Sequence, residues 1–300
     1  MDIMQAIGKK FGYILCAVLL IHLLEFGDGA KRKDWTGKLI FEEHFNGEKL
    51  GRNWEIVGNC EGKGHKDTNL ECFTTREDNV RLRDGLLIIE AWPEEWHPKE
   101  LWAKSKNFTS GKVKMINELG YQYGTFVVRA RLSKGNHLLP SIFLLPAYQD
   151  HDNCKYEEVD IAQGRGQRTS TVIVGAYFGR QWNHASSRKT EKAIRNTDFS
   201  AEFHEFTLVW KQYRLEWFVD GRLIYTIPMY YYSDWLLQDE SNLPCNMNKK
   251  LFQQELQLNF ALSVGGSMFP QAGYGDLTLD DAKNWTKPTL EIDWVKIYDH

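Results

Sequence analysis

Three side chains in the stretch KYEEVDIAQGRG, residues 155–166, have types and spacing suited to acid chemistry. Glu158 and Asp160 stand two residues apart, so on a β-strand their carboxyl groups lie on one face. Gln163 comes five residues after Glu158, where a regular strand would turn its side chain to the opposite face. One extra residue, as in a β-bulge, returns it to the carboxyl face. A bulge in this strand would therefore place two carboxyl groups and one amide side by side.

A pair of carboxyl groups about 5–5.5 Å apart is the equipment of a retaining glycosidase, in which one attacks the sugar and the other protonates the leaving oxygen. In this chain Gln163 stands where the second carboxyl would be expected. An amide has a similar shape and donates a hydrogen bond, but it cannot deliver a proton to the leaving group. Because general acid–base catalysis contributes about 10²–10⁴-fold, a site with an amide in place of this carboxyl would lose that contribution.

The surrounding elements read as strands joined by turns. In residues 125–133, TFVVRARLS, apolar and polar side chains alternate as in a half-buried strand. Residues 214–219 and 222–227 predict an antiparallel hairpin whose turn is Asp220-Gly221. Further strands are predicted at 85–92, 205–210, 256–264 and 289–298. Helical periodicity is poor, so we predict an all-β sandwich or barrel.

The first 29 residues have the order of a secretory signal. Lys9 and Lys10 precede an apolar run over residues 11–24, and small residues follow it. A run of about 14 residues is short for a membrane span, and an uncleaved signal anchor is the alternative. We predict a secreted protein with no membrane association in its mature form. The expected organisation is a signal peptide over 1–29, a short linker over 30–37 and one domain over 38–300.

Secretion would place the cysteines in an oxidising compartment, where they can form disulfides. Cys16 would leave with the signal, so the mature chain keeps four, Cys60, Cys72, Cys154 and Cys245. An even number in an oxidising compartment predicts two disulfides. Cys60 with Cys72 would close a short loop and leave Cys154 with Cys245, although four cysteines allow three pairings.

Composition narrows the ligand. A formal net charge of −3 and a pI near 6.3 lack the basic excess of proteins that bind nucleic acid or anionic membranes. The 11 Trp and 13 Tyr residues suit a carbohydrate binder, although large β-cores also use many aromatic side chains. Asn107 and Asn284 begin glycosylation sequons.

The chain resembles glycoside hydrolase family 16, in its laminarinase-like branch of β-1,3-glucanases and β-1,3-glucan recognition proteins. The resemblance runs from residue 39 to the end and is carried, in the family's order, by LIFEEHFNG, NVRLRDGLLIIEA, YQYGTFVVRARLSKGNHLLPSIFLLP, EVDIAQ, EFHEFTLVWKQYRLEWFVDG and NFALSVGGSMFP. It implies a β-jelly-roll sandwich of two curved antiparallel sheets with a glycan cleft on the concave face. It also implies that Glu158 is the nucleophile, Asp160 its assisting neighbour and Gln163 a replacement for the acid/base Glu.

The resemblance implies further site residues and some departures. The family pattern Trp-Pro-Ala-x-Trp is commonly found where this chain has Leu139-Pro140-Ser141-Ile142-Phe143, which removes one stacking surface and keeps an aromatic at Phe143. Tyr177 stands where the family often has His. Trp182, on the loop that follows, is a candidate sugar platform, with buried packing as the alternative. We predict that Phe143, Tyr177 and Trp182 contact the sugar.

A structural calcium is also implied, because many family members hold one with an Asp of the last strand, here Asp293. The first-strand acidic residue of the family is replaced by His44, so backbone carbonyls would have to complete the shell. The site chemistry itself requires no cofactor.

The function expected from these features is that of a secreted, catalytically impaired β-1,3-glucan-binding protein, suited to the recognition of microbial cell walls. Its partner would be β-1,3-glucan or a related polysaccharide, and the sequence points to no particular protein partner. Two alternatives stay open. One is a retaining endo-β-1,3-glucanase that is weak or uses a relocated acid, and the other is a protein-interaction scaffold that no longer binds glycan.

Overall fold

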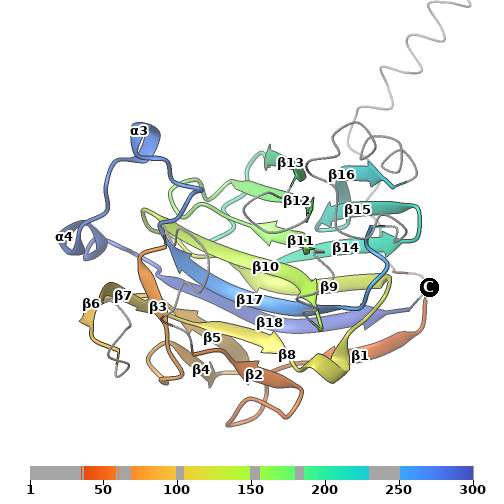
Figure 1. Cartoon of the computed structure of the whole chain (residues 1–300), viewed down its shortest axis with the longest axis horizontal. Coiled ribbons are helices and arrows are strands. Elements are labelled where there is room, and N and C mark those ends of the chain that lie inside the picture. The colour runs from red at the N-terminus through yellow and green to blue at the C-terminus, as the bar shows by residue number, and fades with distance from the viewer. Residues whose placement is uncertain are drawn as a thin grey trace, which may run out of the picture.

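The computed structural model describes residues 35, 37–58, 60, 69–98, 105–148, 156–179, 186–229 and 251–299. These residues build two large antiparallel sheets and one small sheet, with only short helical turns (Figure 1). The all-β prediction is confirmed. The predicted signal peptide, most of the predicted linker and Trp182, Cys154 and Cys245 lie outside the described residues.

The first large sheet, sheet A, contains the C-terminal strand at its centre. Among the described residues it has eight strands in the order β16 (Arg222–Pro228), β15 (Arg214–Val219), β14 (His204–Lys211), β9 (Gly124–Arg131), β18 (Thr289–Tyr298), β5 (Leu86–Glu90) and β4 (Val80–Arg83), with β1 (Leu39–Glu43) also paired to β18.

The second, sheet B, contains the stretch with which the sequence analysis began. Its described strands run in the order β13 (Ser186–Ala193), β12 (Thr171–Gly179), β11 (Tyr156–Gln163), β10 (Leu138–Pro146), β17 (Leu256–Val264), β8 (Lys112–Met115) and β2 (Trp54–Ile56). A small sheet C is made of β3 (Glu71–Phe73), β7 (Lys106–Ser110) and β6 (Trp92–Trp96). The short helices are η1 (Asn117–Leu119), α3 (Gln271–Tyr274) and α4 (Leu279–Ala282).

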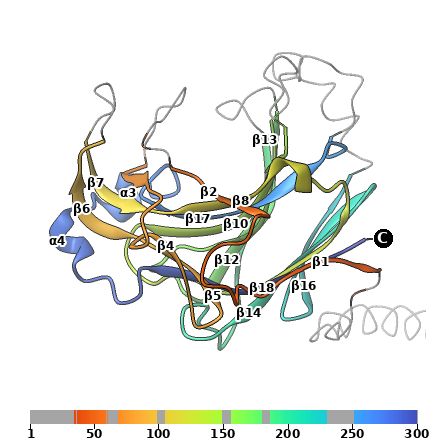
Figure 2. The same ribbon diagram turned by 90° about the horizontal axis from the view of Figure 1, so that it is seen from below.

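The core fills the space between sheets A and B. Alternate residues of sheet B point inward, for example Leu144 of β10 and Phe260 of β17, and meet Phe126 and Leu208 of sheet A. Figure 2 shows the two layers, and sheet B curves so that β13 rises out of the layer formed by β8, β17 and β10. Because inward positions are apolar, the alternate positions on the outer face of sheet B are left for polar side chains.

Two local predictions can be checked directly. Asp220 and Gly221 have φ values of +48° and +75°, the left-handed conformation that a two-residue type I′ hairpin turn requires at both positions. β15 and β16 pair on either side of that turn. Cys60 and Cys72 form a disulfide that closes a loop with a sequence separation of 12, which confirms the short-range pairing.

Two further predictions concern the surface of the described part. Asn107 and Asn284 are both exposed, and their glycosylation stays a prediction. Within the described residues, no helix has the length and apolar character needed to cross a bilayer.

Candidate functional site

The bulge predicted between Asp160 and Gln163 is present in β11. Phe143 of β10 pairs with Asp160, and the residue before it, Ile142, pairs with Ala162, so one residue of β11 has no partner across the ladder. The pairing of β11 with β12 shifts at the same place. As a result Asp160 and Gln163 share a face although three positions separate them. We call this outer face of sheet B, pointing away from sheet A, the site face.

Sheet A holds the bulge in place. A bulge leaves backbone groups outside the regular ladder, and when buried they need another partner. The indole Nε1 of Trp217, a fully buried residue of β15, donates a hydrogen bond to the backbone oxygen of Asp160 at 2.7 Å. Ile161 and Ala162 both belong to the hydrophobic core. The core therefore fixes the conformation that turns Gln163 to the site face.

The amide of Gln163 is engaged with a carboxyl group. Its Nε2 donates to Oδ1 of Asp160 at 3.0 Å, and the hydroxyl of Tyr156 donates to Glu158. Asp160 is 0% exposed and Gln163 is 8% exposed. Among the described residues nothing donates to the remaining oxygens, Asp160 Oδ2 and Gln163 Oε1, nor to Gln257 Oε1 of β17. A buried acceptor left without a donor costs about 1–3 kcal/mol, and a sugar hydroxyl is a donor of suitable size.

The two carboxyl groups have perturbed acidities. Burial raises the pKa of Glu158, and the neighbouring Asp160 and Lys112 oppose that rise. Burial also raises the pKa of Asp160, well above its usual range, and the adjacent Glu158 adds to the effect while Lys189 opposes it. The pair therefore holds a proton more readily than two isolated carboxyl groups would. Such a pair suits hydrogen bonding to hydroxyl groups, which both donate and accept.

Two of the three aromatic residues predicted to contact the sugar, Phe143 and Tyr177, lie on the site face. Phe143 is beside Asp160, and Tyr177 pairs with Glu158 across β11 and β12. A lysine ammonium lies close to each ring, however. Lys112 Nζ lies 5.4 Å from the ring centroid of Phe143, which is only 9% exposed. Lys189 Nζ lies 5.2 Å from the centroid of Tyr177 and donates to its hydroxyl at 3.1 Å.

Glu157 is not a substitute for the missing acid. It points to the opposite side of β11 from Glu158, is fully buried, and accepts hydrogen bonds from the backbone N–H of Phe252 at 2.7 Å and from Gln254 Nε2 at 2.8 Å. Its carboxylate is thus a structural tie between β11 and the start of the 251–299 segment.

Glu71 has a pKa suited to a catalytic acid, but it lies too far from Glu158 and Asp160 to act with them. Burial raises its pKa to about 7, and it accepts hydrogen bonds from the backbone N–H of Val264 at 2.9 Å and from Asn69 at 3.1 Å. Val264 pairs with Leu138, five residues before the Phe143 that lies beside Asp160. At about 3.4 Å per residue the two acids are roughly 17 Å apart along the strands, beyond the reach that shared catalysis needs.

Asp293, the residue expected to hold calcium, lies beside an arginine side chain instead. Asp293 forms an ion pair with Arg129 across β18 and β9, and His44 bonds Glu42 at 2.7 Å. The described residues contain no group of three His, Cys, Asp or Glu side chains that could hold a metal ion. These side chains do not fit a calcium site by themselves, and a site completed by backbone carbonyls stays a prediction.

Comparison with known proteins identifies the fold that carries these residues. The family model described as glycosyl hydrolases family 16 matches residues 73–234, which is more than half of the chain. The chain belongs to glycosyl hydrolases family 16. A family relative, the glucan endo-1,3-beta-glucosidase of Cryptopygus antarcticus, is 30% identical over 280 residues, covering 93% of this chain and 96% of the relative.

Other similar proteins are named for binding. The beta-1,3-glucan-binding protein 1 of Galleria mellonella is 25% identical over 217 residues, which cover 62% of this chain and 43% of that protein. The chain therefore spans less than half of that relative's length. Among solved structures, the laminarinase catalytic domain of Thermotoga maritima superposes with a TM-score of 0.70 at 22% identity, covering 89% of this chain and 99% of that one. The jelly-roll fold of family 16 is thereby confirmed.

Several members of the site face were missed by reasoning from the sequence. Lys112 and Lys189 come from strands far from β11 in the chain, and Gln257 comes from the strand that pairs with β10. The alternation in KVKM, residues 112–115, gives Lys112 and Lys114 a common face. Only the pairing of β8 with β17 shows that this face is the site face.

Proposed function

We propose that this family 16 protein binds a β-1,3-glucan chain on its site face and does not hydrolyse it efficiently. The observation that carries the proposal is the state of Gln163. Its amide stands where the family's proton donor would be, and its N–H is used to bind Asp160 at 3.0 Å. No proton is available from this group for a leaving sugar oxygen.

The same residues support binding. Three buried oxygens on the site face, on Asp160, Gln163 and Gln257, accept no hydrogen bond within the described part of the chain. A glucan offers hydroxyl donors along its whole length, so each contact would relieve a buried acceptor. Glu158 would then act as a hydrogen-bonding carboxyl held by Tyr156, and Asp160 as the group that orients it.

Efficient catalysis would need a proton donor that the described part of the site face lacks. Glu158 would have to be ionised to attack, and burial raises its pKa, which works against ionisation. The other described carboxyl with a raised pKa, Glu71, is too distant to share the reaction. An active endo-β-1,3-glucanase remains the second candidate, favoured by the 30% identity to a glucan endo-1,3-beta-glucosidase. Its acid would have to come from outside the described residues.

We further propose that the protein is secreted and recognises microbial cell walls. The signal-like order of residues 1–29 supports export, and the Cys60–Cys72 disulfide suits an oxidising compartment. Similarity to a beta-1,3-glucan-binding protein supports the ligand class. The sequons at Asn107 and Asn284 would then be available for glycosylation.

A pair of matched variants tests the binding role of the site face. Glu158→Gln keeps the side-chain shape and removes the carboxylate, so we expect roughly 10-fold weaker binding of a β-1,3-gluco-oligosaccharide, as for a lost charge-assisted hydrogen bond. Glu205→Gln, on β14 of sheet A, is the control and should bind as wild type does. Equal affinity of all three proteins would show that the Glu158 carboxylate does not contribute to binding. No ligand-induced rise in melting temperature for wild type would favour the protein-interaction scaffold.

A further inference from the structure

We propose that the site face selects a glycan chain bearing anionic substituents, sulfate esters or carboxylates, through the ammonium groups of Lys112 and Lys189. This inference rests on the proposed function, because it names the chemistry of the chain bound at the same face. It is carried by the positions of the two lysines, by what their amino groups contact and by the rings that they cover.

Lys112 reaches the site from β8, which lies near the edge of sheet B opposite to β13. Its strand pairs with β17 so that Lys112 lies opposite Ala261, which lies opposite Ser141, and the side chain extends to the ring of Phe143. Among the described residues, no carboxylate forms an ion pair with Lys112 and no acceptor takes a hydrogen bond from its amino group. Glu158 interacts with this ammonium electrostatically, but a largely buried ammonium that donates no hydrogen bond to the described residues is incompletely satisfied.

Lys189 comes from the opposite side. It pairs with Gly175, which pairs with Asp160, so the three residues form one row across β13, β12 and β11. Gly175 allows the close approach, since a Cβ there would lie 2.5 Å from the Cβ of Lys189. Lys189 bonds the Tyr177 hydroxyl, and no carboxylate within the described part of the chain forms an ion pair with it.

The two ammonium groups therefore flank the carboxyl groups of Glu158 and Asp160 on β11, one over β10 and the other over β12. From strand spacing and rise, the covered rings are roughly 12 Å apart. A neutral sugar ring gains stability by stacking on an open aromatic face, whereas here one ammonium lies over the Phe143 ring and the other lies beside the Tyr177 hydroxyl. An anionic substituent would instead pair with each ammonium. Burial also lowers the pKa of Lys112, and an anion beside it would oppose that effect.

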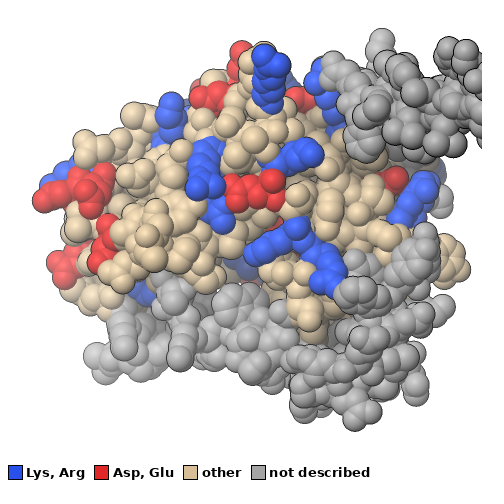
Figure 3. Space-filling view, turned by 90° about the horizontal axis from the view of Figure 1, so that it is seen from above, with Lys and Arg blue, Asp and Glu red and all other residues tan. Residues whose placement is uncertain are grey.

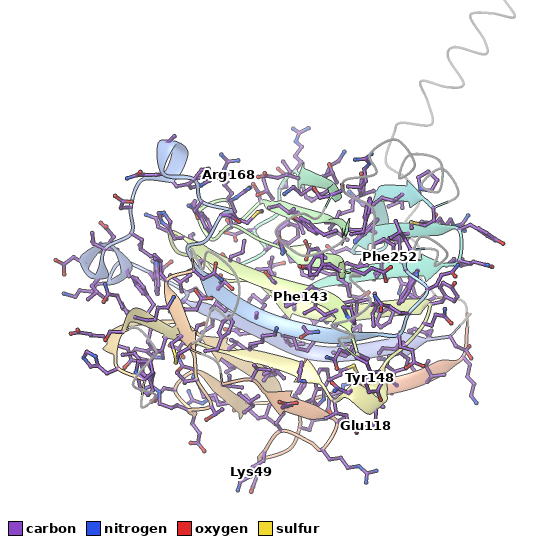
Figure 4. The ribbon with its side chains drawn as sticks, viewed as in Figure 1. Lys49, Glu118, Phe143, Tyr148, Arg168 and Phe252 are labelled. Carbon is purple, nitrogen blue, oxygen red and sulfur yellow. A yellow bond between two sulfur atoms is a disulfide. The ribbon has the colours of Figure 1, made fainter. Side chains whose placement is uncertain are left out.

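Further basic side chains lie beside β13 and come from the segment that follows β11. Glu191 pairs with Ile173, which pairs with Gln163, so its carboxylate is on the site face too. Arg165 and Arg168 share this single carboxylate, at 2.6 and 3.2 Å. Figure 3 shows basic side chains grouped around a central acidic group on the side of the molecule nearest β13, and Figure 4 places Arg168 between α3 and the sheet strands.

Glu158 and Asp160 limit where the anionic groups can sit. An anion directly on the two carboxyls would be repelled, whereas hydroxyl groups would be accepted there. The substituents therefore belong at the two flanks, over Phe143 and Tyr177, with the unmodified part of the chain between them. This arrangement recognises a partly substituted glycan and disfavours a uniformly charged polymer.

The test is a calorimetric titration with three β-1,3-gluco-oligosaccharides of equal length, one neutral, one partly sulfated and one oxidised at C6 to carry carboxylates. We expect at least one charged probe to bind roughly 10-fold tighter than the neutral one, with a preference that shrinks as salt is added. The probe that shows the gain identifies sulfate or carboxylate as the group recognised.

Variants assign the preference to the two lysines. Lys112→Met and Lys189→Met should each lose most of it, while Lys49→Met, an exposed position far from Phe143 (Figure 4), should keep it. Melting temperatures check that the variants fold. Equal affinity for neutral and charged probes would overturn this inference and leave the proposed function standing. An unchanged preference for the charged probes in both lysine variants would also overturn it. So would binding of dextran sulfate, a uniformly charged polymer, with the affinity of the preferred charged probe. Absence of binding by all probes would refute the proposed function itself.

Discussion

Replacing Gln163 with Glu is the perturbation whose consequences the structure defines best. The introduced carboxyl would lie at the present 3.0 Å from Asp160 Oδ1, at a position only 8% exposed. When protonated it can donate the hydrogen bond that the amide donates now. When ionised it loses that bond and adds a further negative charge beside the carboxyl groups of Glu158 and Asp160.

The magnitudes follow from these contacts. Loss of a hydrogen bond to a charged group costs about 1.5–3 kcal/mol. Repulsion between two charges 3 Å apart is at most about 5 kcal/mol at an effective dielectric constant of about 20, so the carboxyl should take up a proton instead of ionising. Its pKa is then raised above the ordinary value of about 4.3, which is the property a proton donor requires.

Two outcomes are expected for Gln163→Glu. Hydrolysis of a β-1,3-glucan, measured as released reducing ends between pH 5 and 8, should rise by about 10²–10⁴-fold over wild type. Stability should match that of wild type near pH 4 and fall as pH rises, by about 2 kcal/mol at pH 8, because the folded state holds a proton that the unfolded state releases.

A matched control is available on the same face. Gln257→Glu also introduces a buried carboxyl, but on β17, away from the proton-donor position, and should give no hydrolysis. Wild-type cleavage as fast as that of Gln163→Glu would refute the reasoning about the amide. If Gln163→Glu folds and binds glucan but stays inactive, the missing acid alone does not explain the loss, and Leu139 and Tyr177 become the residues to restore.

The remaining predictions concern stability. Because burial raises the pKa of Glu71 from near 4.5 to about 7, the folded protein binds a proton more tightly than the unfolded chain, and stability falls between those pH values by about 3 kcal/mol. Glu71→Gln should therefore gain stability relative to wild type at pH 8 compared with pH 5 in urea denaturation, while the exposed Glu48→Gln should not; parallel pH profiles for all three would contradict this. Trp217→Phe removes the hydrogen bond to the Asp160 carbonyl and should cost about 1–3 kcal/mol. It should also weaken glucan binding, since the bulge is less firmly held; a variant with unchanged stability and binding would show that the bulge does not depend on this bond.

Local sequence patterns were sufficient to predict much of the site. The spacing of Glu158 and Asp160 predicted a strand with both carboxyl groups on one face, and the family resemblance implied the bulge that brings Gln163 to the same face. The Asp220-Gly221 turn was predictable for the same kind of reason, since few residue pairs tolerate positive φ at both positions.

Contacts between strands distant in sequence could not be predicted in this way. Lys112 covers Phe143 only because β8 pairs with β17, and nothing near residue 112 encodes that pairing. The same holds for Arg129, whose pairing with Asp293 across β9 and β18 supplies a cation where the family resemblance implied calcium. The raised pKa values of Glu158 and Asp160 also depend on burial, which is a property of the assembled sheets.

The central claim is that the site face binds a glucan and leaves it intact. Its most direct test is a calorimetric titration of wild-type protein with a β-1,3-gluco-oligosaccharide, after which the sugar is recovered and its length measured. We predict saturable heat and sugar of unchanged length. Shortened sugar would contradict the assignment of Gln163 as a non-functional proton donor, and absence of both heat and cleavage would contradict glucan binding.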